Sequence, residues 1–337
     1  MIVTVTMNPA IDKTVEIETL IPGGLNRIRQ VEYDAGGKGI NVSKTIRALG
    51  GTSIATGFLG GSAGKMIEKV LEEQEIEHHF IWVKGETRTN TKVHERNGSV
   101  TELNEPGPVI SEKRCSELCS LLLELAGPET LFVLAGSIPG GMDPKIYGEI
   151  IRLVHGKEAK VLLDADGQLF RNALESGPDM IKPNRAELEG FMGTENGASE
   201  KELLAAAKRL KETGIESVTV SMGGNGAMLL LPGFEVRCPA LSVKAQSTVG
   251  AGDAMVAAMA YSWDKKLSPE ETVRFCMAAS AGAVTTVGTK PPTRELVDTL
   301  KEQVMMEQIG EETACQQKRS ECMEQEICVW KSLNFRR

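Results

Sequence analysis

The sequence predicts an α/β protein in which helices flank a mostly parallel central sheet that carries a small antiparallel β lid. Apolar runs of strand length alternate with longer amphipathic runs over most of the 337 residues. Such alternation is typical of parallel strands joined by helical crossovers. Because ligands gather at the carboxyl ends of parallel strands, we expect the functional residues in the loops that follow them.

The elements of the main sheet can be followed along the chain. Short runs rich in Val, Ile, Leu and Phe predict strands at residues 2–7, 53–59, 130–135, 160–164, 179–182, 217–221 and 227–231. The longer runs between them predict helices at residues 41–49, 63–74, 111–126, 144–154 and 199–213. Another helix is expected over residues 254–260, where apolar residues continue without Gly or Pro.

Two segments depart from this pattern and predict the lid. Residues 14–18 and 88–96 alternate residue by residue, and the second runs through Asn97-Gly98, a hairpin signal, into residues 99–103. Side chains in a strand repeat with period two, so one face would carry Arg88, Asn90, Lys92, His94 and Arg96. This face fits either a solvated edge that deters aggregation or a cover over an anionic ligand.

Composition excludes several classes of partner. The formal charge of −8 and the pI near 5.3 disfavour nucleic acid and anionic membrane surfaces, and no apolar stretch reaches the roughly 18 residues that a membrane span needs. The seven cysteines include no Cys-x-x-Cys pattern, which favours reduced thiols over a structural zinc site. With no signal-peptide pattern at its start, the chain is expected to be cytoplasmic.

One loop, Gly250-Ala251-Gly252-Asp253, carries the most telling chemistry. The free N–H groups and the dipole of a helix start attract phosphate-like charge. A carboxylate at that place repels the ligand, so Asp253 suits a base that takes a proton from a hydroxyl as it attacks phosphorus. The alternative is an Asp that only caps the helix after a tight turn.

Familiar nucleotide signatures are absent from the sequence. The glycine clusters do not fit Gly-x-Gly-x-x-Gly, and no Gly-Lys pair is followed by Ser or Thr as a P-loop requires. The motif set of protein kinases is also missing.

Four motifs, the last of which contains this loop, resemble in their order those of the ribokinase-like (PfkB) carbohydrate kinases. They are Asn-Pro-Ala-Ile-Asp at residues 8–12, Ala-Gly-Gly-Lys-Gly-Ile-Asn-Val at 35–42, Lys-Pro-Asn-Arg-Ala-Glu at 182–187 and Thr-Val-Gly-Ala-Gly-Asp at 248–253. The resemblance implies an ATP-dependent kinase that uses Mg²⁺. Residues 24–27 and 87–90 resemble the branch that acts on ketohexose monophosphates. Fructose 1-phosphate, converted to fructose 1,6-bisphosphate, is the preferred substrate, with tagatose 6-phosphate and fructose 6-phosphate as alternatives.

The resemblance also sets the expected domain organisation. Residues 1–307 would form one kinase domain, with lid strands within about residues 13–34 and 80–104. Residues 308–337 form a C-terminal tail whose composition departs from the rest and whose role the sequence does not reveal.

On the sugar side, the resemblance implies that Asp12 and Asn41 orient the hydroxyls of the sugar, although both could simply be capping residues. Lys38, Arg88 and Arg27 would hold the phosphate that the sugar already carries. The remaining expected substrate contacts are Gly37, Asn90 and Ser137, the last of which could also be an ordinary turn serine.

The nucleotide is expected over the second half of the chain. The resemblance implies that Glu187 supports Mg²⁺, often through water, while Lys182 and Asn184 face the phosphates. The Asn-x-x-Glu spacing is equally a helix-capping pattern. Further nucleotide contacts would come from Ser221, Gly223, Gly226 and Thr248, and the small residues of 277–284 would either line the adenine pocket or only pack closely.

A homodimer built through the lid strands is the expected assembly. A small lid sheet has one ligand-facing side and another, carrying Val15, Ile17 or Val93, that needs cover. Arg27 could then reach a phosphate in the neighbouring subunit, and a monomer is the alternative. Two other classes stay open: a sugar-phosphate sensor, which would have no use for Asp253, and a nicotinamide-dependent oxidoreductase, which would need the missing glycine fingerprint.

Overall fold

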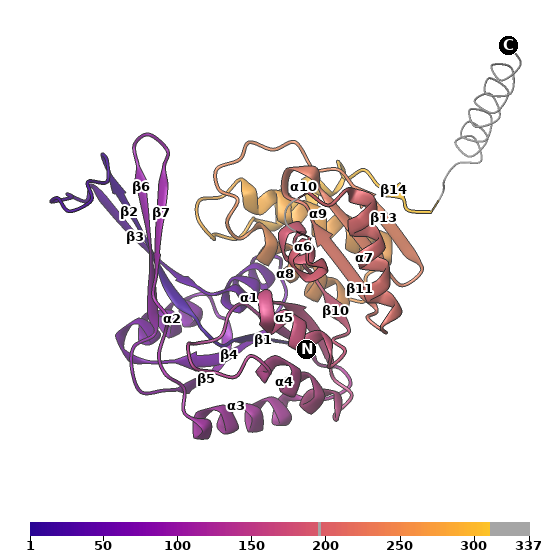
Figure 1. The fold of residues 1–337 in the computed structure, drawn as a ribbon, viewed down its shortest axis with the longest axis horizontal. Helices are drawn as coiled ribbons and strands as arrows, with labels where there is room; N and C mark the ends of the chain where they lie inside the picture. The colour runs from indigo at the N-terminus through magenta and orange to yellow at the C-terminus, as the bar shows by residue number, and fades with distance from the viewer. Residues whose placement is uncertain (195–196, 311–337) are drawn as a thin grey trace, which may run out of the picture.

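The computed structural model describes residues 1–194 and 197–310. Its centre is a ten-stranded sheet in the order β14-β13-β12-β11-β10-β9-β8-β1-β4-β5, which runs across both halves of Figure 1. The strands are β1 (Ile2–Thr6), β4 (Ile54–Leu59), β5 (Glu77–Trp82), β8 (Leu131–Ala135), β9 (Lys160–Asp164), β10 (Met180–Ile181), β11 (Ser217–Ser221), β12 (Ala227–Leu231), β13 (Phe234–Cys238) and β14 (Glu307–Gln308). Pairing is parallel from β5 to β11 and antiparallel from β11 to β14. The predicted fold class is therefore confirmed.

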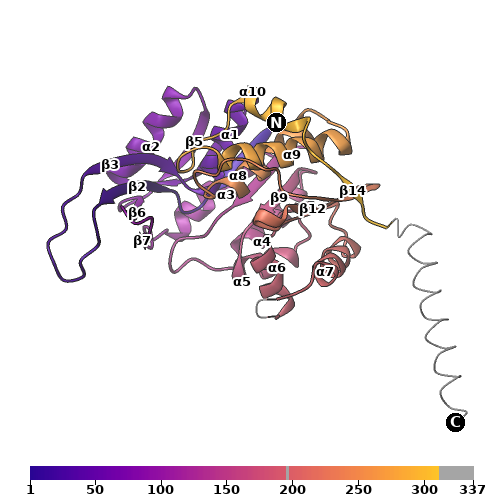
Figure 2. The ribbon, with the colours of Figure 1, turned by 90° about the horizontal axis from the view of Figure 1, so that it is seen from above.

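Helices cover both faces of this sheet (Figure 2). On one face lie α3 (Glu112–Leu125), α4 (Ile146–His155), α5 (Gly167–Leu174), α6 (Arg185–Met192) and α7 (Glu200–Glu212). On the other lie α1 (Lys38–Ala48), α8 (Ala251–Asp264), α9 (Pro269–Val284) and α10 (Arg294–Lys301), while α2 (Gly61–Glu73) packs beside β4 and β5. Helices α5 and α10 and strands β3, β5, β13 and β14 were not predicted, and of α6 only the first turn, after Asn184, was.

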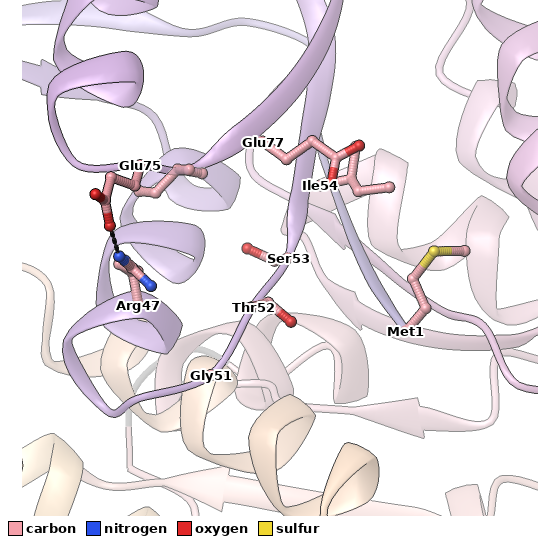
Figure 3. A pocket seen from close by; sticks show the side chains of 9 residues that line it. Met1, Arg47, Gly51, Thr52, Ser53, Ile54, Glu75 and Glu77 are labelled. Carbon is pink, nitrogen blue, oxygen red and sulfur yellow. Dashed lines mark hydrogen bonds and ion pairs between the residues drawn. The ribbon is translucent and has the colours of Figure 1, made fainter.

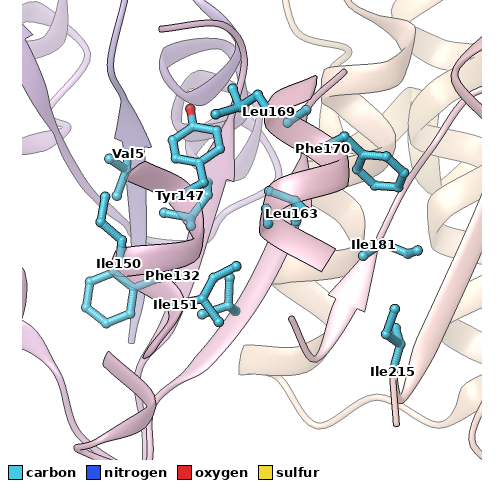
Figure 4. Close-up of a cluster of buried hydrophobic side chains, with 14 of the residues drawn as sticks. Val5, Phe132, Tyr147, Ile150, Ile151, Leu163, Leu169, Phe170, Ile181 and Ile215 are labelled. Carbon is cyan, nitrogen blue, oxygen red and sulfur yellow. The ribbon is translucent and has the colours of Figure 1, made fainter. Parts of the chain in front are cut away.

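The period-two alternation of the strands divides the core between these two faces. On β8, Phe132 and Leu134 pack under the first helix layer, whereas Leu131 and Val133 pack under the second. Figure 4 shows the first cluster, with Phe132, Tyr147 and Ile150 packed between sheet and helices. Every one of these side chains is buried, and burial of a large apolar side chain stabilises by about 1.5–3 kcal/mol. The rigid sheet that results holds the strand ends, and so the loops, in place.

The lid is a separate four-stranded sheet that projects from the core in Figure 1. Its order is β3-β2-β6-β7, with β2 (Ala10–Ile17), β3 (Gln30–Gly36), β6 (Arg88–Glu95) and β7 (Val100–Asn104). The outer pairs are antiparallel as predicted, but β2 and β6 are parallel, with Asp12 opposite Asn90. Strand β2 begins at Ala10 instead of residue 14, so Asp12 lies within a lid strand and not at the end of the first strand.

The folded domain continues past the predicted boundary at residue 307. Strand β14 pairs Gln308 with Val236, and the N–H of Ile309 donates to the carbonyl of Glu235 at 2.9 Å. The rest of the predicted tail, residues 311–337, lies outside the described residues. Within the described ranges, no helix is long and apolar enough to cross a membrane.

Candidate active site

Helix α8 starts at the glycine turn for which the sequence predicted anion binding. Gly250 caps the helix in the left-handed region, at φ 85°, a conformation that favours glycine. The N–H groups of Ala251, Gly252 and Asp253 stand in the first turn, where an α-helix offers them no acceptor. A side chain on Gly252 would point at the ammonium of Lys182, since a Cβ built there lies 3.5 Å from Nζ. The bare backbone thus keeps a path open between the turn and this lysine.

Asp253 is buried beside this turn. Its Oδ2 accepts a 2.8 Å hydrogen bond from Nδ2 of Asn41 on α1, so two predicted site residues meet. Burial, together with the nearby charge of Asp164, raises the pKa of Asp253 to about 6 even though Asn41, Lys38 and Lys182 favour the ionised form. A carboxyl group of this kind can accept a proton near neutral pH.

Asp164, which the sequence analysis missed, lies between two lysines at the end of β9. Its Oδ1 is 3.2 Å from Nζ of Lys182, and its Oδ2 is 3.3 Å from Nζ of Lys38. Burial by itself would raise the pKa of Asp164, but Lys182 and Lys38 outweigh burial and hold that pKa below its usual value. The signal was present in the sequence, because Asp164 directly follows an apolar strand at the sheet edge where ligands bind.

The same charges act on Lys38. Burial disfavours its charged form, yet the carboxylates of Asp164, Glu187 and Asp253 raise its pKa above the ordinary lysine value. Lys38 therefore remains a cation. It was expected to hold the phosphate of the sugar together with Arg88 and Arg27, whereas the structure places it among the residues of the cavity that also contains Lys182 and Glu187.

This cavity, of about 540 Å³, contains most of the residues predicted for the nucleotide. Its lining includes Lys38, Asp164, Lys182, Asn184, Glu187, Ser221, Gly223, Gly226, Thr248, Ala251, Gly252 and Asp253. A bridge between Asn184 and Ser221 brings the start of α6 against the end of β11. One face of α9, formed by Met277, Ser280, Ala281 and Val284, lines the cavity together with Leu241 and Val243. The lining thus includes both charged and apolar side chains, as a nucleoside phosphate requires.

Glu187 takes the capping position that its spacing allowed. Its Oε2 accepts from the N–H of Asn184 at 2.8 Å, and Oδ1 of Asn184 accepts from the N–H of Glu187 at 2.8 Å. No group of three or more His, Cys, Asp or Glu in the described part of the chain could hold a metal by itself. Carboxylates on one cavity wall nevertheless fit Mg²⁺, which prefers oxygen and retains several waters. Glu187 and Asp164 are the residues that would hold it.

The glycine turn between β11 and β12 is shaped for close approach. Gly226, at φ 87°, leaves no space for a side chain, because a Cβ would lie 1.9 Å from the carbonyl oxygen of Cys238. Gly223, at φ 56°, has open space beside it and lines the cavity. The turn is therefore more constrained than an ordinary hairpin connection.

A second cavity, of about 800 Å³, lies between the lid and the core. The lid contributes Asp12 and Lys92, and the core contributes residues 245–249 and 287–290. Ala245 and Thr248 line both cavities, so the two spaces adjoin. We call the second cavity the lid cleft and the first, after the ligand predicted for it, the nucleotide cavity. A ligand in one can thus lie next to a ligand in the other.

Asp12 is held on the lid face that the alternation predicted. Its Oδ1 accepts from Nδ2 of Asn90 at 3.3 Å, and its Oδ2 lies 3.4 Å from Nζ of Lys92. Gly36 makes room for it, because a Cβ at that position would lie 2.8 Å from Oδ2. The second glycine of the motif, Gly37, caps α1 at φ 112°. These contacts aim a carboxylate at the cleft next to the helix that carries Asn41.

The other predicted cations are less tightly grouped. Arg88 donates from Nε and Nη2 to the carbonyl of Asn8 at 3.3 and 3.1 Å and from Nη1 to the carbonyl of Glu105 at 3.3 Å. Burial lowers the pKa of Arg88 below its ordinary value. Ser137 is exposed in the turn after β8, and Arg27 is exposed in the loop between β2 and β3. The structure does not bring Arg27 into either cavity of this chain.

A third cavity, of about 220 Å³, contains none of the predicted site residues. Figure 3 shows that Arg47 and Glu75 pair across it, with Ser53 and Glu77 nearby. Among the described residues, Arg47 is the only Lys or Arg that lines this cavity, and it is paired with Glu75.

Comparisons with known proteins agree with this geometry. The family described as "pfkB family carbohydrate kinase" matches residues 1–296. A 1-phosphofructokinase from Vibrio cholerae is 34% identical over 305 residues, covering 90% of this chain and 96% of that protein. A tagatose-6-phosphate kinase from Staphylococcus epidermidis is 35% identical over 279 residues, covering 81% and 89%.

Among solved structures, phosphofructokinase-2 from Escherichia coli in complex with potassium superposes with a TM-score of 0.85 at 28% identity, covering 90% of this chain and 98% of that one. The same enzyme has a structure described as its tetrameric inhibited form.

Proposed function

The chain belongs to the pfkB family of carbohydrate kinases, and from this membership we propose that it transfers the γ-phosphoryl group of ATP to a hydroxyl of a ketohexose monophosphate. The observation that carries the proposal is the place of Asp253. Its carboxylate stands beside the free N–H groups of α8 and lines the nucleotide cavity, which adjoins the lid cleft at Ala245 and Thr248. A protein that only binds the sugar phosphate would gain nothing from a carboxylate beside an anion-binding turn, because the two negative charges repel each other.

Different residues would orient the sugar, accept its proton and stabilise the transferred phosphoryl group. Asp12 in the lid cleft and Asn41 beside Asp253 orient the sugar so that its acceptor hydroxyl faces Asp253, which takes the proton as the oxygen bonds to phosphorus. The N–H groups of Ala251, Gly252 and Asp253 stabilise the charge on the transferred phosphoryl group. The bond to the leaving oxygen of ADP breaks in line, through a loose transition state that needs little prior deprotonation.

Two cations assist at the nucleotide side. Lys38 and Lys182, which both pair with Asp164, line the same cavity as the turn at the start of α8. Their positive charges offset the negative charge of the ATP phosphates. Mg²⁺ bound near Glu187 and Asp164 would neutralise further phosphate charge. The apolar part of the lining, with Met277 and Val284, suits the adenine.

Fructose 1-phosphate, phosphorylated at its 6-hydroxyl, is the substrate that we favour. The lid segment Thr87–Lys92 and the segment from Gly288 to Thr293 resemble those of 1-phosphofructokinases, and one of the relatives above carries that name. Tagatose 6-phosphate and fructose 6-phosphate are the alternatives, because one relative is named a tagatose-6-phosphate kinase and phosphofructokinase-2 from Escherichia coli has a structure in complex with fructose-6-phosphate. We assign the contact with the existing phosphate to Arg88, at the start of lid strand β6.

A coupled assay for ADP release tests the proposal. We expect turnover with ATP, Mg²⁺ and fructose 1-phosphate, and lower kcat/KM with tagatose 6-phosphate, fructose 6-phosphate and unphosphorylated fructose. A higher kcat/KM for either alternative would change the substrate but keep the reaction. Binding of sugar phosphate without ADP release from any of the four would contradict the kinase assignment and favour a sensor.

We also propose that two copies associate through the outer face of the lid. The sequence analysis expected Val15, Ile17 and Val93 to need cover, but these side chains are already buried within one chain. The strand registers place the exposed Val31, Tyr33 and Leu103 on the same face, at 39%, 56% and 59% exposure. This remaining apolar surface is what a second copy would bury.

Sedimentation equilibrium at micromolar concentration, with and without substrate, tests the dimer. The charge-bearing variant Leu103→Asp should dissociate it, whereas Lys69→Asp, on the exposed surface of α2, should not. A monomer under both conditions, with full activity, would contradict both the interface and a role for Arg27 in the neighbouring site.

A further inference from the structure

A single lid carboxylate, Asp34, joins three separate parts of the chain. It lies near the base of β3, just before Gly36. Its Oδ1 accepts from Nζ of Lys44 on α1 at 2.7 Å, and its Oδ2 accepts from Oγ1 of Thr289, in the loop after α9, at 3.0 Å. Both oxygens of Asp34 are thus used within the protein, and neither contact is explained by the transfer reaction described above.

Through Lys44 on α1, Asp34 is connected to the helix that also contacts Asp253. The side chain of Lys44 is only 2% exposed, and its acceptors are Asp34 and the carbonyl of Ala35. Lys44 stands one helical turn after Asn41, whose amide orients Asp253. A shift of the lid base against Lys44 therefore acts on the helix that orients Asp253.

The contact with Thr289 leads to the anion turn. Thr289 is buried, and its Cα lies 3.4 Å from where a Cβ on Gly250 would stand. The loop that receives the lid bond thus packs directly behind the residue that starts α8. Gly250 is in a left-handed conformation, so the path of the turn depends on close backbone packing there.

We propose that Asp34 is a positioning residue that couples the two substrate sites: sugar phosphate binding under the lid raises the affinity for ATP through the Asp34–Thr289 bond. The inference rests on the proposed function. A ligand that contacts Asp12 holds the lid sheet in one position, and Asp34, directly opposite Asp12 on the neighbouring strand β3, moves with that sheet. Thr289 packs against Gly250. A lid held in one position therefore favours one arrangement of the N–H groups at the start of α8, which would bind phosphate. The coupling is reciprocal, so ATP raises the affinity for the sugar phosphate by the same factor.

Thr289→Val tests the bond most cleanly, because it removes only the hydroxyl and leaves the Asp34–Lys44 pair intact. The affinity of a non-hydrolysable ATP analogue is measured by calorimetry with and without saturating fructose 1-phosphate. In the wild type we expect tighter binding of the analogue when the sugar phosphate is present. Thr289→Val should reduce this ratio about fivefold to tenfold, Thr289→Ser should retain it, and Thr299→Val, an exposed threonine of α10, should leave it unchanged.

Asp34→Asn, with melting temperature as a folding check, should lower the same ratio. Two results would overturn the inference: a Thr289→Val protein whose analogue affinity changes equally with and without sugar phosphate, or a wild type that turns over but shows no ratio above one. These results are distinct from failure of the proposed function, which would appear as absence of ADP release in the wild type.

Discussion

The side-chain amide of Asn41 donates a 2.8 Å hydrogen bond to Oδ2 of Asp253, although the two residues stand 212 positions apart in the chain. The bond fixes the carboxylate before any substrate arrives. It leaves the group able to accept a proton, because a carboxylate offers two oxygens with several acceptor positions. Helix α1, which follows the lid, thereby orients the proposed base on α8.

Replacement of Asp253 by Asn should reduce turnover by roughly 10²-fold to 10⁴-fold, because the shape is retained while the base is lost. KM for ATP and for the sugar phosphate should change little. Steady-state kinetics measure both, with Asp264→Asn as the matched control at the far end of the same helix. Turnover near the wild-type value would remove Asp253 from its proposed role.

The pH dependence of the reaction should report the same carboxyl group. The pKa of Asp253 is raised to about 6, and only the ionised form accepts a proton, so kcat/KM should fall as the pH drops below about 6. Profiles between about pH 5 and 8 measure this, with saturating ATP and limiting sugar phosphate. A profile that stays flat down to about pH 5 would contradict the assignment.

The stability of the protein should show the cost of keeping Asp253 buried. Its folded pKa lies above the unfolded value, so ionisation favours the unfolded state, and the penalty grows between about pH 4 and 6 and persists above. Asp253→Asn should therefore raise the free energy of unfolding by about 1–3 kcal/mol at pH 7. Urea unfolding at pH 7 and at about pH 4 measures the difference, which should vanish at the lower pH.

Loss of the Arg88 guanidinium should weaken binding of the sugar phosphate. Arg88→Ala should raise its KM by roughly 10-fold to 100-fold, because a charge-assisted contact is worth about 1.5–3 kcal/mol, and KM for ATP should change less. Arg96→Ala is the control, since this exposed arginine of the lid tip pairs only with Glu18 among the described residues. An effect on ATP alone would assign the lid strand to the nucleotide.

Removal of the charge of Asp164 should affect both folding and nucleotide binding. Asp164→Asn leaves Lys38 and Lys182 without their shared anion, and breaking a buried pair costs about 3–5 kcal/mol. We expect a lower unfolding free energy and a raised KM for ATP, with Asp166→Asn, at the exposed cap of α5, as the control. Wild-type stability together with a wild-type KM for ATP would show that the ion pairs of Asp164 have no such role.

The sequence by itself determined most strands of the main sheet and most of the helices. Strands with continuous apolar runs were found because both faces are buried, and the loops at their carboxyl ends follow from parallel topology. Strands β3 and β5 were missed because half of their side chains are polar or exposed, so their burial depends on neighbours that the local sequence does not name.

Only the tertiary structure decided which charges act together. Asp164 resembles any turn aspartate in sequence, and its role comes from Lys38 and Lys182, which lie on other segments at a distance of 3.2–3.3 Å. Likewise, Lys38 lines the nucleotide cavity, and Asp34 meets Thr289 across 255 positions. Periodicity encodes which side of an element is buried, whereas the energy of a charge depends on distances of a few ångströms between elements, and those distances exist only once the chain has folded.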